Sequence, residues 1–442
     1  MSFFDRIFKP SEPEILGPDI TFGRYTDSYK SKEQFAAWDK CLEEFENGNY
    51  LDSYRAFFQY LSDSEERNIQ LEEEKGLIHF TLYQGSKKVI GEASRLGVKA
   101  EAKVAQASEL KSSFTRRMLE LNFDLKYSRY ALNPNNDITI VFDTGSSDGS
   151  PYKLYHALKE LATSADKQDD LLLDEFKQLQ PLETSHLIEI GKSEKSVKYQ
   201  YICQEIDKVL ALVDGEGLDI RTYPGAFSYL LLELCYRLDY LIKPEGFMME
   251  TLERLNRLYF SNPSQNTLQK IYLLRTELEA LRKRSVEEFY KEMYRTKNSF
   301  GITSSIDHHK VKAIIDGEIH NMDWYQENGH LQVALAIPSY IVGYCLFTYA
   351  VPRPIRDLFH LYYHIMEPEY FRALGFQTPY RQSGSNALDR KSIRKRIRAI
   401  AGRYEEHYAH LSPKLGLLDY SDPVNFARTY LYMITQLDFS IG

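Results

Sequence analysis

The spacing of hydrophobic residues changes several times in the first half of the chain. Apolar residues recur every three or four positions through 32–61, with a break at Gly48, which predicts a helical hairpin. Apolar and polar residues then alternate at 76–83 and 87–92, on either side of a short polar turn, and again at 98–104. Because such alternation is typical of strands with one buried face, we expect three strands after the hairpin.

The stretch 112–178 continues this mixed pattern. It predicts a helix, a strand at 123–127, an asparagine-rich turn and a β-branched strand at 138–142. A serine followed by a proline, Ser150 and Pro151, then opens a long amphipathic helix. Elements in this order predict an α+β fold in which helices pack on one face of an antiparallel sheet.

From residue 187 onward the pattern is mainly helical, with prolines between the helical segments. Helical spacing is found at 193–213, 226–242, 246–260 and 267–294. The next stretch, 295–330, is polar and rich in turn formers, as loops are. Three further helices are expected at 357–367, 387–411 and 423–437.

The segment 331–351 carries no charged residue over its whole length. A segment of this length could form a membrane-spanning helix. Pro338, Ser339 and Gly343 interrupt it, and the chain has no second segment of this kind. We therefore favour two buried strands, joined at Pro338-Ser339 in the core of a soluble domain, over a transmembrane helix.

These patterns divide the chain into four parts. We expect an N-terminal tail and linker (1–31), an α+β domain (32–185), a helical region (186–295) and a C-terminal domain of α/β or helical type that contains a basic helix (296–442). The tail starts with an apolar turn that could touch a membrane, although its small area favours packing on its own domain. This turn contains Phe3, Phe4, Ile7 and Phe8.

Composition narrows the classes of function. The net charge of −8 argues against binding of nucleic acid by the chain as a whole. Four cysteines lie far apart without a CxxC pair, which is typical of a reducing, cytoplasmic compartment. The 33 tyrosines predict broad half-buried surfaces of the kind found at protein interfaces.

Three phrases within 30–178, LELNFDLKYSRYAL, DITIVFD and SPYKLYHALKELATSADK, resemble the bacterial YbjN-like and type III secretion chaperone fold. The resemblance implies helices packed on a twisted antiparallel sheet, and a function in binding other proteins without catalysis. It carries over no functional residue. We therefore expect a cytoplasmic bacterial protein that acts like a chaperone or adaptor and needs no cofactor.

The segment DTGSS, which begins at Asp143, resembles the active-site loop of pepsin-like aspartic peptidases. In that family a second aspartate shares a proton with the first, because two like charges so close cannot both ionise. This chain has no second DTG or DSG, so a peptidase would require a homodimer. Pro151 also starts a helix where the family continues as a strand. We therefore expect a structural strand-to-helix loop, with Asp148 or Ser150 capping the helix.

Two histidines, His360 and His364, are spaced one helical turn apart, with Glu367 three residues further on. This spacing could bind zinc, but the zincin glutamate is missing and the neighbours are aromatic, so we expect a packing helix and no metal. A looser polar cluster, which we expect to be a solvated loop, contains Asp307, His308, His309, Asp316 and His320.

Positive charge is concentrated between Arg381 and Arg403, where Asp389 is the one acidic residue. An apolar stripe along this helix is formed by Ile393, Ile397 and Ile400. We predict that the charged positions off the stripe bind a partner, namely Arg390, Lys391, Arg394, Lys395 and Arg398. The partner would be an acidic protein surface, an anionic lipid or a nucleic acid. The alternative is a solvated helix that balances the protein's own acidic stretches, 65–74 and 166–175.

Three functions stay open at this point. The first is a non-catalytic protein-binding protein, which the absence of Walker, GxGxxG, GxSxG and zinc-ribbon motifs favours. The second is a hydrolase, either a dimeric aspartic peptidase through Asp143 or a metal-dependent enzyme through His360 and His364. The third is a membrane-associated component that uses 331–351 or the N-terminal turn.

Overall fold

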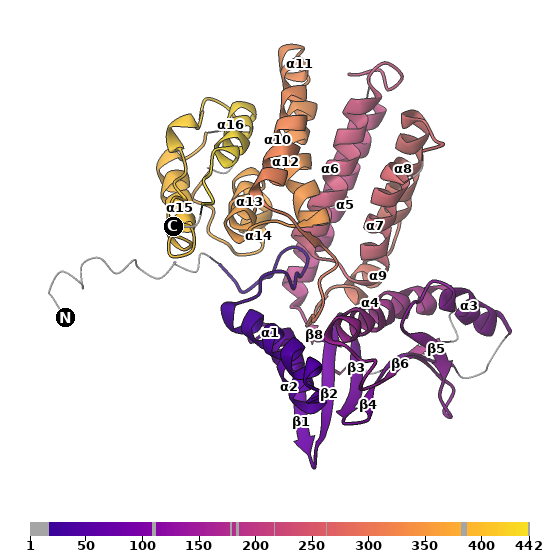
Figure 1. Cartoon of the computed structure of the whole chain (residues 1–442). Coiled ribbons are helices and arrows are strands. Elements are labelled where there is room, and N and C mark those ends of the chain that lie inside the picture. The colour runs from indigo at the N-terminus through magenta and orange to yellow at the C-terminus, as the bar shows by residue number, and fades with distance from the viewer. Residues whose placement is uncertain are drawn as a thin grey trace, which may run out of the picture.

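The computed structural model of the chain describes residues 17–107, 112–176, 179–182, 185–215, 217–261, 263–381 and 387–440. They form an α+β lobe (32–182) and a larger helical lobe (185–291 and 304–440), which lies above it in Figure 1. Each lobe has an apolar core of its own. The predicted α+β class, with a mainly helical C-terminal region, is thus confirmed.

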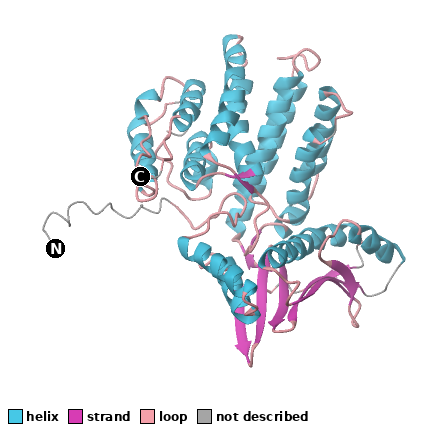
Figure 2. Cartoon of the chain, viewed as in Figure 1, coloured by secondary structure: helices cyan, strands magenta, loops and turns pink. Residues whose placement is uncertain are grey.

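An antiparallel sheet with helices on one face makes up the α+β lobe (Figures 1 and 2). The strand order is β1-β2-β3-β4-β6-β5, and β7 pairs with β4. Phe80, Ala102 and Ile140 are buried on the helix-covered face, whereas His79 and Lys99 on the other face are exposed. The elements are α1 (Lys32–Glu46), α2 (Tyr50–Leu61), β1 (Ile69–Glu74), β2 (Leu77–Gln84), β3 (Lys87–Ser94), β4 (Gly97–Ala107), α3 (Ser112–Asn122), β5 (Arg129–Leu132), β6 (Asp137–Gly145), α4 (Pro151–Glu175) and β7 (Leu179–Pro181).

The helical lobe is built around two apolar helices, α6 (Pro224–Ile242) and α12 (Leu331–Thr348), which pack against each other. Gly343 permits their close approach, since a Cβ there would come within 2.7 Å of the Tyr236 Cβ. The surrounding helices are α5 (Lys192–Asp214), α7 (Gly246–Phe260), α8 (Thr267–Arg282), α9 (Val286–Lys291), α10 (His308–Glu318), α11 (Met322–Glu327), α13 (Arg353–Met366), α14 (Pro368–Ala373), α15 (Arg390–Gly402) and α16 (Pro423–Thr435). Two short sheets, β8 (Ile188–Glu189) with β9 (Tyr294–Arg295) and β10 (Ser304–Ser305) with β11 (Tyr349–Ala350), tie loops together.

Segments far apart in sequence hold the two lobes together. The extended segment 17–31 packs Phe22 into the helical core, and its Gly23 N–H donates to the Tyr240 carbonyl at 2.8 Å. The segment 296–303 returns to the α+β lobe and buries Phe300 in its core. Asp27 joins both segments, because it accepts hydrogen bonds from the Gly301 N–H and the Tyr155 hydroxyl. The junction is therefore an ordered part of the structure.

The predicted strand at 123–127 is wrong, although the hairpin, the strands at 76–83, 87–92 and 98–104 and the strand at 138–142 are confirmed. Phe123 is 91% exposed, and the strand begins only at Arg129. The Glu160 carboxylate on α4 accepts hydrogen bonds from the backbone N–H groups of 126–128, so these groups are unavailable to a strand partner. The acidic edge strand β1 was not predicted from the sequence.

The two buried strands predicted within 331–351 are also wrong, because this segment is mainly the single helix α12, with Pro338 inside it. Its burial is confirmed: within the described residues α12 is the one helix long and apolar enough to cross a membrane, and 72% of its most apolar window is buried inside the protein. The polar stretch 295–330 forms α10 and α11 in place of a loop. The helix predicted at 267–294 is broken between α8 and α9, and the basic helix ends at Gly402.

Candidate functional site

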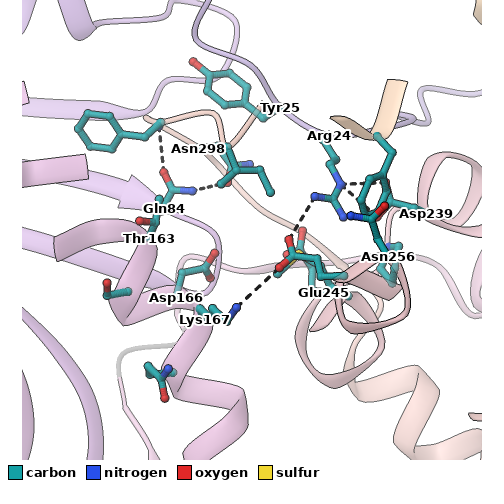
Figure 3. A pocket seen from close by; sticks show the side chains of 18 of the residues that line it. Arg24, Tyr25, Gln84, Thr163, Asp166, Lys167, Asp239, Glu245, Asn256 and Asn298 are labelled. Atoms are coloured by element: carbon teal, nitrogen blue, oxygen red, sulfur yellow. Dashed lines mark hydrogen bonds and ion pairs between the residues drawn. The ribbon is translucent and has the colours of Figure 1, made fainter. Parts of the chain in front are cut away.

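A cavity with a volume of about 570 Å³ lies between the two lobes (Figure 3). Both lobes and the segment 17–31 contribute to its wall. A cavity of this size at a domain interface is a usual place for a small-molecule site. Its labelled polar side chains include Arg24, Gln84, Asp166, Lys167, Asp239 and Asn298.

The charged side chains of this cavity are largely engaged with one another. Arg24 binds Asp239 on α6 at 2.7 Å and Glu253 on α7 at 3.1 Å. Lys167 on α4 reaches across the cavity to α7, where it pairs with Glu250 at 2.8 Å and with Glu253 at 3.7 Å. Figure 3 shows Lys167 pointing toward the opposite lobe. Paired charges of this kind fix the lobes relative to each other and leave little charge for a ligand. The cavity therefore has the character of a polar junction.

Helix α15 carries the partner-binding residues predicted from the sequence. Its stripe of Ile393, Ile397 and Ile400 is buried, as expected. Arg390, Lys391, Lys395 and Arg398 are exposed and Arg394 is half-buried. Within the part of the chain that the structure describes, none of these five forms an ion pair; Arg390 instead lies 5.7 Å from the ring centre of Tyr420. The structure thus places the five cations on one helix, at the end of the helical lobe (Figure 1).

The two histidines of α13 are packing residues with neutral rings. The Nε2 of His364 donates to the Gln377 carbonyl at 3.0 Å, and its ring stacks on Phe371 at 4.3 Å between centres. Burial lowers the pKa of His360 to about 3 and that of His364 to about 4. Among the described residues, no group of three His, Cys, Asp or Glu is placed to hold a metal ion.

The looser polar cluster at 307–320 is helical, so the predicted solvated loop is wrong. Asp307 caps α10, because its side chain accepts a hydrogen bond from the Lys310 N–H at 2.9 Å. His308 is half-buried, with Nε2 2.9 Å from the Ile434 carbonyl of α16. Their polar groups therefore stabilise the start of a helix and its contact with α16.

Asp143 lies near the end of β6, on the open face of the sheet, and the predicted structural role fits its surroundings. It forms an exposed ion pair with Arg129 on β5 at 2.6 Å and stands opposite Lys99 on β4. The predicted loop is wrong for the DTG letters, because Asp143 to Gly145 are the end of β6 itself. The predicted cap is confirmed, since Ser150 accepts a hydrogen bond from the Lys153 N–H at the start of α4. The carboxylate thus lies in a row of cross-strand charges.

We expect the substitution Asp143→Asn to change the free energy of unfolding by no more than about 1 kcal/mol, because exposed ion pairs contribute little. Urea unfolding followed by circular dichroism would measure this. The same variant and the wild type should show equal, background cleavage of casein at acidic pH. A pepstatin-sensitive cleavage that disappears in Asp143→Asn would contradict the structural assignment.

Comparison of the chain with models of known protein families, with curated proteins and with solved structures gives no match. The sequence did not point to the cavity between the lobes, since Arg24 lies in a segment that reads as a linker and its partners are more than 200 positions away. The apolar N-terminal turn lies outside the described residues.

Proposed function

We propose that this protein is a non-catalytic binding protein that engages an acidic protein partner through the exposed cations of α15. The observation that carries the proposal is that five basic side chains on one helix have no ion pair within the described residues. Elsewhere, half-exposed arginines commonly do pair, as Arg55 does with Glu73 and Arg282 with Asp207. An unbalanced basic face attracts an acidic surface at short range, where screening weakens the repulsion from the rest of a chain of net charge −8.

Two further points support a protein partner over a lipid or a nucleic acid. A nucleic acid or an anionic membrane carries a denser and more extended negative charge than an acidic protein surface does, so the net charge of −8 repels it more strongly. Helices on one face of an antiparallel sheet are also what the resemblance to secretion chaperones implies, and those proteins act by binding other proteins. Both points support an adaptor or chaperone-like role.

The alternative, internal balance of α15 by the protein's own acidic stretches, is less well supported. The stretch 65–74 lies in the α+β lobe, where Glu73 pairs with Arg55. Asp166 on α4 accepts from the Ser86 N–H at 2.7 Å. No ion pair within the described residues joins either stretch to α15.

The triple substitution of Arg394, Lys395 and Arg398 by Glu tests the proposal. The probe is a fluorescein-labelled oligoglutamate peptide, whose binding is followed by anisotropy over a range of salt concentrations. We expect wild-type binding that weakens steeply with salt, and at least about tenfold weaker binding by the variant, since charge pairs of modest strength add up. The fold should persist, because exposed substitutions usually change stability by no more than ~0.5 kcal/mol each.

A matched control changes the charge by the same amount elsewhere. Lys32, Lys40 and Lys414 are exposed and lie off α15, so their replacement by Glu should preserve most of the binding. An equal loss of oligoglutamate affinity in both triple variants would show that only the net charge of the protein matters, and would contradict the proposal. Tighter binding of duplex DNA, or of phosphatidylserine vesicles, than of oligoglutamate at the same salt would also contradict it.

A further inference from the structure

A second cavity, of about 240 Å³, lies between α13 and α15 and is separate from the exposed cations described above. Arg396 and Arg403 line it, and they are seven residues apart, about two helical turns, so they lie on one side of α15. Arg394 and Arg398 are not part of its wall. The helix thus presents basic side chains in two directions.

The basic groups of this cavity outnumber its acidic ones. Asp357 accepts hydrogen bonds from Arg403 at 2.7 Å and from the Tyr404 hydroxyl at 2.7 Å. Arg396 is half-buried, and no ion pair within the described residues engages it.

Half-buried guanidinium groups without a carboxylate are costly, because burial removes part of their hydration and no opposite charge replaces it. The buried cations Arg24 and Arg237 of this protein each bind at least two carboxylates. Arg396 lines this cavity without one among the described residues. The missing counter-charge is what an anionic ligand would supply.

One histidine of the cavity, His360, can serve as a hydrogen-bond donor without adding charge. The Tyr240 hydroxyl lies 3.1 Å from the His360 Nδ1. When this hydroxyl donates, the neutral ring carries its proton on Nε2, and no described residue accepts it there. His364 is held by Gln377 and shapes the wall.

We infer that this cavity binds the phosphate group of a small molecule, held by Arg396 and Arg403 with the His360 Nε2–H as a neutral donor. Guanidinium groups match phosphate because each presents two parallel N–H donors to two oxygens. A volume of about 240 Å³ accommodates a phosphate with a small organic group attached. This site goes beyond the proposed partner binding, and its key residues differ from the cations assigned to the partner.

Inorganic phosphate is the probe for the test, titrated into the full-length protein at constant ionic strength and followed by calorimetry and by the ³¹P line width. We expect saturable binding to the wild type and at least about tenfold weaker binding to Arg396→Gln, the usual loss when one charged hydrogen-bond donor is removed. Arg396→Lys keeps the charge but not the fork of donors, so its affinity should fall between the two.

The control is Arg398→Gln, which removes the same charge from an exposed position of the same helix and should leave phosphate affinity nearly unchanged. Circular dichroism verifies that each variant is folded. If Arg396→Gln does not fold, the test is whether Arg396→Lys binds phosphate more weakly than the wild type. Equal weakening by Arg396→Gln and Arg398→Gln, or no saturable binding by the wild type, would overturn the inference. Tighter binding of acetate than of phosphate would overturn the choice of phosphate.

Discussion

Replacing Arg237 by methionine is expected to destabilise the helical lobe by about 3–5 kcal/mol, because it leaves buried carboxylates without their cation. Arg237 is 5% exposed. It binds Glu233 at 2.5 Å, Glu205 at 2.8 Å and Glu367 at 3.1 Å, and so joins α5, α6 and the end of α13. This is the largest electrostatic effect that we expect from a single substitution in the chain.

The measurement is urea unfolding followed by tryptophan fluorescence. The two tryptophans lie in different lobes, Trp38 in α1 and Trp324 in α11, so a Trp38→Phe background reports on the helical lobe. The control is Arg282→Met, which breaks the exposed pair with Asp207 and should cost no more than about 1 kcal/mol. Similar costs for both variants would show that the Arg237 cluster is not a buried network.

The pH dependence of Arg237→Met follows from the same reasoning. Without the cation, burial raises the folded-state pKa of the remaining carboxylates above their unfolded values, as it already does for Glu367. The folded variant then binds more protons than the unfolded chain, so its stability falls as pH rises. The deficit relative to the wild type should therefore be smaller at mildly acidic pH than at neutral pH.

Truncating Ile341 to alanine should cost about 2–5 kcal/mol, because it removes three methyl or methylene groups from the packed centre of α12. Ile341 is fully buried, on a helix that packs against α6 and α16. The substitution Leu331→Ala on the same helix is the control, since Leu331 is 50% exposed and should change stability by no more than ~0.5 kcal/mol. Unfolding in the Trp38→Phe background measures both.

Two outcomes would count against α12 as a core helix of the folded chain. A small cost for both truncations would mean that Ile341 is not packed as described. Recovery of the untagged protein only from detergent-extracted membranes would favour the membrane-associated alternative, in which the same apolar residues face lipid.

The sequence was informative about chemistry where several features agreed. Helical spacing and charge together located α15 and its buried isoleucine stripe, and the absence of a second DTG segment anticipated that Asp143 has a structural environment. The cavity between α13 and α15 was not predicted. In the sequence, Arg396 is one more positive charge of a basic helix. Only the packing of α13 beside α15 brings it into the same cavity wall as His360.

What the sequence by itself determined is the set of elements whose pattern is local. Alternation of apolar and polar residues determined β2, β3 and β4, because one face of each strand is buried and the other is not. Helical spacing of apolar residues, together with the capping residue Ser150, determined α4. The tertiary structure decided the rest. Residues 126–128 do not form a strand, because their N–H groups donate to the Glu160 carboxylate. The segment 331–351 became a helix because neighbours on nearly all sides bury it, and a helix without a polar face has no periodicity that distinguishes it from a strand.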